Sequence, residues 1–264
     1  MEIIGYLSAA LIGLSLGLIG GGGSILTVPV LVYLLGVEPV AGTAYSLFIV
    51  GLTSLVGSWS KYKEGFVDLK TAAVFGAPSI VAVYLTRALL VPAIPEQLFT
   101  IGSFELTRPL LLMLLFAILM VAASVSMIRD AKPAAPKTEG GYRYGLILLE
   151  GAVVGTLTGL VGAGGGFLII PALVLLTGLP MKMAVGTSLL IIAAKSLIGF
   201  TGDLGHLAID WPMLLSISGI AIAGIFGGNY LSRKIDGSKL KKTFGWFVLV
   251  MGVFILVKEL GLLG

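Results

Sequence analysis

Long apolar blocks alternate with short polar segments along most of this chain. A hydrocarbon layer about 30 Å thick is crossed by about 20 helical residues. Two blocks, residues 24–36 and 167–178, are too short to span such a layer upright. Because backbone polar groups in lipid must bond within their own segment, the pattern predicts an all-α integral membrane protein. Blocks of full length cover residues 3–20, 40–60, 69–91, 109–128, 144–161, 183–202, 211–232 and 243–262.

The composition excludes several other classes of protein. Of the 264 residues, 57% are hydrophobic and 11% are charged, whereas soluble domains carry about 25% charged residues. A soluble globular enzyme and a disordered chain are therefore excluded, and the lack of cysteine excludes a disulfide-stapled module. The net charge of +4 comes from residues between apolar blocks, so it does not indicate nucleic-acid binding. No Lys or Arg precedes Lys61, so the first block lacks the basic start of a signal peptide and is predicted to be a permanent helix.

The chain contains an internal repeat. The segment Gly17–Pro29 reads GLIGGGGSILTVP and aligns with Gly159–Pro171, which reads GLVGAGGGFLIIP, at an offset of 142 residues. We therefore predict a duplication, with a first transmembrane repeat over residues 1–128, a linker over 129–143 and a second repeat over 144–264. Further aligned pairs are Gly42-Thr43 with Gly186-Thr187 (which drifts by two positions), Thr53–Gly57 with Lys195–Gly199, and Val67-Asp68 with Ile209-Asp210.

The distribution of Lys and Arg predicts an orientation. Cytoplasmic loops carry an excess of these residues, and a cytoplasmic linker places 13 of the 17 basic residues inside. Residues 61–70 are then basic, whereas the equivalent residues 203–210 contain no Lys or Arg. The two repeats are therefore predicted to have inverted topology, with both termini outside and about five helical segments each. Five crossings per repeat result if the short segments cross, and three if they re-enter.

The two glycine runs are candidate binding loops. Glycine costs about 1 kcal/mol relative to alanine within a helix, so four in succession should break it and leave a short helix behind a glycine-rich loop. The start of that short helix would present free N–H groups and a positive dipole end, which favour an anion. The alternative is close helix packing through small residues. The candidate binding residues here are Gly21, Gly22, Gly23, Ser24, Gly164, Gly165 and Gly166.

Lys195 lies near the middle of block 183–202. A charge at that depth is costly, and intramembrane ionisable residues usually have a function. We expect Lys195 to attract an anionic substrate or to titrate with a coupled proton; the alternative is a side chain that snorkels to the interface. Glu150 could pair with Lys195 and take part in proton coupling, or could itself snorkel. The equivalent of Lys195 in the first repeat is Thr53.

Hydroxyl side chains near the glycine runs complete the candidate lining. They can replace part of the hydration shell of an oxyanion, or can bond within their own helix bundle without a ligand. The single histidine, His206, is expected to be a solvated loop residue, because one His without Cys cannot form a standard zinc site. We predict no catalytic residue, metal or cofactor. The candidate lining hydroxyls are Thr43, Thr53, Ser54, Thr187, Ser188 and Ser196.

The duplicated segments Gly17–Pro29 and Gly159–Pro171, each followed by a Gly-Thr and a Ser-Leu-x-Gly element, resemble the sulfite exporter TauE/SafE family. The resemblance covers nearly the whole chain. It implies a bacterial or archaeal cytoplasmic-membrane transporter of small anions, such as sulfite, thiosulfate, sulfonates or organic acids. It carries over to the glycine and proline motif positions and their neighbouring hydroxyls, whereas the role of Lys195 is inferred from its position alone.

The sequence therefore predicts a secondary transporter that moves a small anion by alternating access between inverted repeats. The expected partners are the anionic substrate, the lipid bilayer, a coupling proton or sodium ion, and further copies of the chain in a homo-oligomer. An anion channel with the same broken helices is the alternative. An intramembrane enzyme would need paired carboxylates or a Ser–His arrangement, which the spans lack, and a purely structural scaffold leaves Lys195 unexplained.

Overall fold

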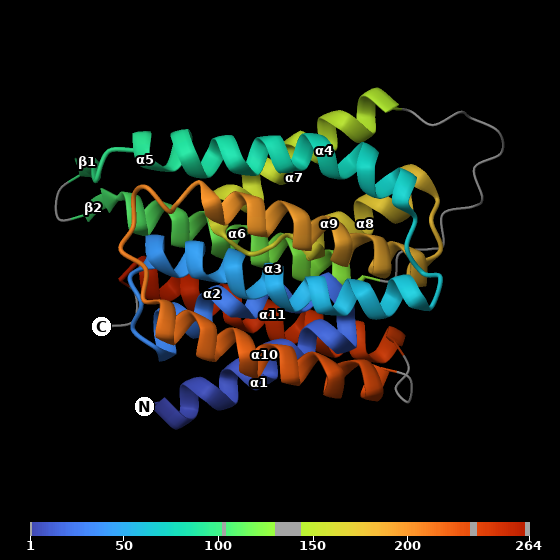
Figure 1. Ribbon diagram of the computed structural model, residues 1–264. Coiled ribbons are helices and arrows are strands. Elements are labelled where there is room, and N and C mark those ends of the chain that lie inside the picture. Colours follow the sequence, from blue (N-terminus) through green and yellow to red (C-terminus); the bar gives the residue numbers. More distant parts are fainter. Residues whose placement is uncertain (1, 102–103, 130–143, 233–236, 262–264) are drawn as a thin grey trace.

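The computed structural model describes residues 2–101, 104–129, 144–232 and 237–261. They form a bundle of helices whose axes lie roughly along one line, with chain directions in both senses (Figure 1). The predicted linker residues 130–143 and the basic residues Arg233 and Lys234 lie outside the described residues. The long helices of the first half are α1 (Glu2–Ile19), α3 (Pro39–Lys63), α4 (Leu69–Leu85) and α6 (Arg108–Ile128). Those of the second half are α7 (Tyr144–Val161), α9 (Met181–Thr201), α10 (Trp211–Ser232) and α11 (Gly237–Glu259).

Short helical segments lie at both glycine runs: the first includes its run, and the second begins at the last glycine of its run. In the first half, the 3₁₀ segment η1 (Gly20–Leu26) leads into α2 (Thr27–Pro29) and the π-helical turn η2 (Val30–Leu34). In the second half, α8 (Gly166–Ala172) leads into the π-helical turn η4 (Leu173–Thr177). A third π-helical turn, η3 (Thr86–Leu90), extends α4 and is followed by α5 (Val91–Ala93).

Each predicted apolar block coincides with helix to within a few residues, so the all-α membrane fold is confirmed. By length and apolar composition, five helices within the described ranges are able to cross a membrane: Pro39–Lys63, Leu69–Ala93, Arg108–Ile128, Met181–Thr201 and Trp211–Ser232. The sequence did not predict the antiparallel hairpin of β1 (Gln97–Ile101) and β2 (Phe104–Thr107). This hairpin joins α5 to α6, where the chain reverses direction (Figure 1).

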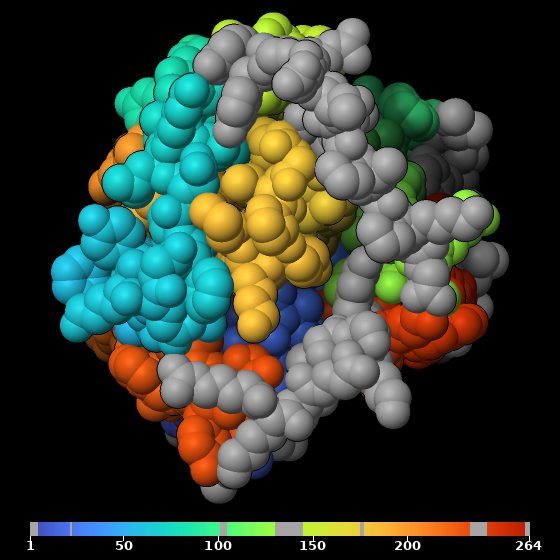
Figure 2. Space-filling model, turned by 90° about the vertical axis from the view of Figure 1, so that its right-hand side faces the viewer, coloured from blue at the N-terminus to red at the C-terminus, as the bar shows by residue number. Residues whose placement is uncertain are grey.

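The bundle has two ends, which we name by their contents. The hairpin end contains the β1–β2 hairpin, Glu38 and residues 202–210. A cavity of about 450 Å³ there brings these regions together, because Glu38, Gln97 and Leu207 all line it. The lysine end contains Lys61, Lys63, Lys70 and Lys182. Viewed from the lysine end, the α8–η4 segment lies at the centre beside the turn between α3 and α4 (Figure 2). Figure 1 shows that α1 begins and α11 ends at the hairpin end.

Helices of the two halves pack on one another in matched pairs. Helix α1 packs on α10, where Gly13 lies directly against the carbonyl of Ala221. Helix α7 packs on α4, where Gly155 has the same relation to Ser79. Gly155 is 142 residues after Gly13, and Ala221 is 142 residues after Ser79. The same contact therefore occurs twice, with the roles of the halves exchanged; below, residues 142 positions apart are called counterparts.

A pair of hydrogen bonds extends this correspondence to the N-termini of α4 and α10. The N–H of Asp68 donates to Thr187 Oγ1 (2.9 Å), and the N–H of its counterpart Asp210 donates to the Tyr45 hydroxyl (2.7 Å). In the structure the counterpart of Thr187 is therefore Tyr45 and not Thr43. The sequence alignment of the two Gly-Thr elements, which needed a drift of two positions, does not describe how the halves correspond.

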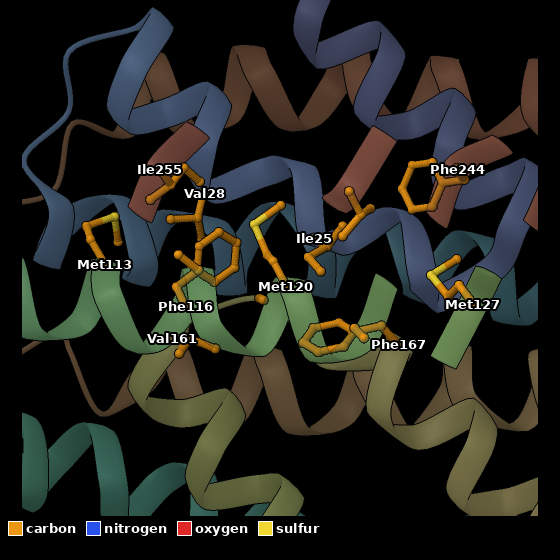
Figure 3. Close-up of a cluster of buried hydrophobic side chains, with 14 residues drawn as sticks. Ile25, Val28, Met113, Phe116, Met120, Met127, Val161, Phe167, Phe244 and Ile255 are labelled. Carbon is orange, nitrogen blue, oxygen red and sulfur yellow. The ribbon is translucent and has the colours of Figure 1, made fainter. Parts of the chain in front are cut away.

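A cluster of apolar side chains holds the short segments in the bundle (Figure 3). Ile25 and Val28 from the first half and Phe167 from α8 pack against Phe116 and Met120 of α6. Helix α11 closes the cluster on the other side and packs along α6. Flexible methionine side chains suit such a site because they fill irregular gaps between helices of unequal length.

Candidate functional site

The two glycine runs meet inside the bundle. A Cβ on Gly21 would lie 2.8 Å from the Cα of Gly166, and a Cβ on Gly166 would collide with the backbone of Gly21. Gly20 and its counterpart Gly162 both have positive φ angles, of 72° and 69°, which residues with a Cβ rarely adopt. The α-helical conformation ends before each run, at Ile19 and at Val161. We name this meeting point the glycine crossing.

The two breaks differ in form. In the second half Gly162, Gly164 and Gly165 all have positive φ, so the chain leaves the helical conformation between α7 and α8. In the first run Gly20 has a positive φ, Gly21 and Gly23 are not among the residues with one, and the chain continues at once as the 3₁₀ segment η1. The Ser24 hydroxyl donates to the carbonyl of Gly21 (2.8 Å) and closes this turn. The prediction of a glycine-rich loop in each repeat is therefore corrected for the first half, where the run forms a hydrogen-bonded turn.

Lys195 lies beside the open loop of the second half. Its side chain is fully buried, and Nζ donates to Thr158 Oγ1 on α7 (2.7 Å). Nζ lies 2.9 Å from the position that a Cβ on Gly165 would occupy, so it touches the left-handed part of the loop. No carboxylate within the described ranges forms an ion pair with Lys195. Among the described residues, the ammonium group therefore has one hydroxyl partner and no negative counter-charge.

Some of the predicted residues gather at the crossing. Ser188 Oγ lies 3.5 Å from where a Cβ on Gly21 would be. The Cβ of Ser24 lies 3.3 Å from where a Cβ on Gly164 would be. Gly23 instead faces the backbone of α1 at Ser15 and Leu16. Gly22 lies between Gly21 and Gly23 in the chain. The structure thus brings together seven predicted residues: Gly21, Ser24, Gly164, Gly165, Gly166, Ser188 and Lys195.

The central helices α3 and α9 contribute a matched pair of free hydroxyls. Ser54 and its counterpart Ser196 are fully buried, and neither hydroxyl has a hydrogen-bond partner within the described residues. They follow Thr53 and Lys195 directly in the sequence. The Thr53 hydroxyl, in contrast, donates to the carbonyl of Ile49 in its own helix (2.6 Å). The hydroxyls of Ser54 and Ser196 are therefore free to donate a hydrogen bond to a ligand, whereas that of Thr53 already donates within its own helix.

Two predicted hydroxyls bond away from Lys195. Thr187 bonds to the backbone of Asp68 at the lysine end, about 12 Å along α9 from Lys195. The Thr43 hydroxyl bonds to Arg87 on the hairpin-end side, although the backbone of Thr43 lies directly against Gly162. Thr43 therefore joins the glycine crossing through its backbone and not through its hydroxyl.

Glu150 also lies apart from Lys195. It is half-buried on α7, eight residues before the Thr158 that bonds Lys195, which corresponds to about 12 Å along the helix. A Glu150–Lys195 pair is absent from the described part of the chain, because Lys195 contacts α7 at Thr158, about two helical turns from Glu150. This pairing is therefore corrected.

The sequence reasoning missed a buried ion pair. Arg87 in η3 is fully buried, and its Nε donates to both carboxylate oxygens of Asp203 (3.0 and 2.8 Å), while Nη2 lies 2.7 Å from Oδ1. Nη1 donates to Thr43 Oγ1 (2.9 Å) and to the carbonyl of Gly159 (3.2 Å). Burial raises the pKa of the Asp203 carboxyl, and the Arg87 guanidinium acts in the opposite direction. The available signal was an arginine inside block 69–91, because charges within such blocks are usually paired.

His206 lies near this pair but is exposed, and its N–H donates to the backbone carbonyl of Asp203 (3.0 Å). Within the part of the chain that the structure describes, no three His, Asp or Glu side chains gather so as to hold a metal ion.

Comparison with known proteins agrees with this architecture. A family model described as sulfite exporter TauE/SafE matches residues 6–255. The chain belongs to the sulfite exporter TauE/SafE family. The described structure and this membership identify it as a multi-pass membrane transporter rather than an enzyme, with a small-molecule substrate.

Several relatives of this TauE/SafE protein are named probable membrane transporter proteins. One from Xylella fastidiosa strain Temecula1 is 29% identical over 258 residues, which cover 94% of this chain and 92% of the relative. YunE of Bacillus subtilis strain 168 is 28% identical over 263 residues, which cover 91% and 89%. One from Haemophilus influenzae strain Rd is 26% identical over 278 residues, which cover 96% and 97%. No solved structure matches the chain significantly.

Proposed function

We propose that this TauE/SafE protein is a secondary transporter that moves a small anion, of the sulfur-oxyanion, sulfonate or carboxylate class, across the cytoplasmic membrane by alternating access. The observation that carries the proposal is the fully buried Lys195 ammonium beside the glycine crossing, without a carboxylate partner in the described ranges. Desolvating an ammonium group is costly unless a counter-charge is near. The Thr158 hydroxyl supplies a dipole and no charge, so a bound anion would complete this site.

The surroundings of Lys195 suit an oxyanion. The ammonium group and the backbone of the Gly164–Gly166 loop beside it are hydrogen-bond donors. The unpartnered hydroxyls of Ser54 and Ser196, which follow Thr53 and Lys195 in the sequence, are further candidate donors. The N–H groups of Gly166 and Phe167, at the start of α8, donate no backbone hydrogen bond within the described residues. Charge-assisted hydrogen bonds from such groups are stronger than neutral ones.

The site lies where the two halves of the molecule meet. Gly51 packs on Leu197 and Gly57 packs near Leu189, so α3 and α9 are antiparallel and cross at the level of Thr53 and Lys195. Transporters built from inverted repeats bind their substrate at this interface near the bilayer midplane. This placement supports transport by relative movement of the halves, with residues 1–128 and 144–264 as the two repeats.

The course of the helices supports inverted topology. Helices α1 and α3 begin at the hairpin end, whereas α7 and α9 begin at the lysine end (Figure 1). The segment after α1 returns to the hairpin end, where the Tyr33 hydroxyl donates to Glu259 (2.6 Å). We place the lysine end and the linker in the cytoplasm, following the distribution of basic residues. Single cysteines from Lys63→Cys and Gly205→Cys should react with an impermeant thiol reagent from opposite faces; reaction from one face would refute this topology.

The function is tested by flux into proteoliposomes. We expect saturable uptake and counterflow of at least one of sulfite, thiosulfate, a sulfonate or a carboxylate, measured with and without a pH or sodium gradient. Counterflow separates a transporter from an anion channel, which does not exchange substrate. Lys195→Met should reduce flux to background while the protein stays folded. Lys182→Met is the matched control, because Lys182 is an exposed lysine of the same helix; parental flux in Lys195→Met would remove Lys195 from the site.

A further inference from the structure

The Arg87–Asp203 ion pair ties four elements together on the hairpin-end side of the crossing. Arg87 belongs to η3 in the first half, and Asp203 follows α9 in the second half. Nη1 of Arg87 adds Thr43 of α3 and the carbonyl of Gly159 of α7. Thr43 also lies directly against Gly162, so these contacts border the crossing on its hairpin-end side, about 15 Å along α3 from Thr53 at the level of Lys195. Any separation of the two halves at the hairpin end has to break the contacts of Arg87 with Asp203 and with the carbonyl of Gly159.

The local backbone is shaped for this contact. Arg87 lies in a π-helical turn, and such turns occur frequently at functional sites. The counterpart residues 228–232 are regular α-helix in α10. Gly202 lets the chain after α9 approach η3 closely, since a Cβ there would lie 3.0 Å from the N of Ala88 and 3.1 Å from the Cβ of Arg87. The half that holds Arg87 therefore has a backbone feature that its counterpart lacks.

The counterpart positions at the lysine end cannot form the same contacts. The counterpart of Arg87 is Asn229, that of Asp203 is Lys61, and that of Thr43 is Val185. Lys61 is partly exposed and bonds Glu64 in its own helical turn (3.1 Å). An amide, a lysine and a valine offer no charge pair across the halves. The two ends of the bundle are thus chemically unequal although their helices correspond.

We propose that Arg87, Asp203 and Thr43 form a gate at the hairpin end, which must open before the site around Lys195 can exchange solute with that side. The lysine end, which lacks the counterpart ion pair, opens more readily. This inference rests on the proposed transport function, but its test requires no transported solute.

Ser46 provides a reporter behind the gate. It lies one helical turn beyond Thr43 on the same face of α3, is fully buried, and its hydroxyl has no partner within the described residues. Ser46→Cys therefore loses no hydrogen bond and introduces a single thiol into a chain without cysteine. The counterpart variant Ser188→Cys places a reporter at the equivalent depth from the lysine end. Both are purified, reconstituted in oriented proteoliposomes and treated from each face with an impermeant, positively charged methanethiosulfonate.

With Ser46→Cys, reaction from the hairpin end should be slow in the parent and about tenfold faster after Asp203→Asn, because a charge-assisted bidentate contact is lost. Reaction of Ser188→Cys from the lysine end should stay within about twofold of its parent value, because the described counterparts Lys61 and Asn229 form no such contact. Lys61→Gln, the change at the counterpart of Asp203, should alter neither rate. An unchanged rate for Ser46→Cys after Asp203→Asn would overturn the gate.

A second variant keeps the test decisive if Asp203→Asn fails to fold with an uncompensated arginine. Arg87→Met combined with Asp203→Leu removes both charges, a replacement that buried ion pairs often tolerate. Folding is checked by a single symmetrical peak in size-exclusion chromatography. The faster reaction is again expected, and a folded double variant with the slow parental rate would refute the proposal. Absence of flux for every anion tested, with gating observed, would instead count against the proposed substrate class alone.

Discussion

The two glycine breaks occupy counterpart positions, but they differ in what surrounds them. The first is a hydrogen-bonded 3₁₀ turn closed by Ser24. The second is an open loop with three left-handed glycines and the Lys195 ammonium beside it. The common features, which are helix lengths, glycine positions and packing contacts, build the scaffold. The features found in one half alone, Lys195 and Arg87, are charged, buried and costly, and they mark where function has to be sought.

The strongest way to break this comparison is to move the ammonium group from one half to the other. Thr53→Lys combined with Lys195→Thr keeps the composition and places the charge at the counterpart position. There the counterpart of Thr158 is Leu16, which offers no hydroxyl, and the neighbouring glycine turn is closed. We expect flux in proteoliposomes to fall to background. Retained flux would mean that the two halves are functionally interchangeable and that the open loop is not required.

Alanine at the first glycine of each break should lower the free energy of unfolding by different amounts in the two halves. Gly20 and Gly162 both need a positive φ, which costs about 1–2 kcal/mol for a residue with a Cβ. A Cβ on Gly20 meets a methyl group of Val185 at 2.5 Å, which is able to move, whereas one on Gly162 collides with the backbone carbonyl of Thr43. Gly162→Ala should therefore destabilise the protein by at least about 3 kcal/mol and Gly20→Ala by about 1–2 kcal/mol. Thermal unfolding in detergent measures both, and equal losses would contradict this difference.

The smallest expected effect tests the correspondence of the halves itself. Tyr45→Phe and Thr187→Val each remove the acceptor of a helix-start N–H, of Asp210 and of Asp68 respectively. Each should cost about 1 kcal/mol, and the two losses should add because the bonds lie at opposite ends of the bundle. Tyr84→Phe, on an exposed side chain, is the control and should change stability by less than about 0.5 kcal/mol. A loss in one variant alone would show that the two bonds are not equivalent.

Several errors of the sequence reasoning have one origin. Glu150 and Lys195 each lie inside an apolar block, which allows a pair as well as a snorkelling Glu150, yet α7 presents Thr158 and not Glu150 at the level of Lys195. The letters of the two Gly-Thr elements agree, although contacts match Thr187 with Tyr45. Letters along one helix do not reveal its vertical alignment with a neighbour, since helices in lipid are apolar on most sides and no polar face indicates which side is buried.

The sequence by itself determined the class of protein, the extent of nearly every helix and the position of Lys195 near the middle of an apolar block. It did so because block length and backbone hydrogen bonding within a segment are local properties that lipid enforces. Only the tertiary structure decided which side chains meet: Lys195 with Thr158, the two glycine runs with each other, and Arg87 with an aspartate 116 residues away. These contacts depend on how far each helix is displaced along its neighbours, and that displacement results from close packing of glycine, serine and alanine between helices, which hydropathy does not encode.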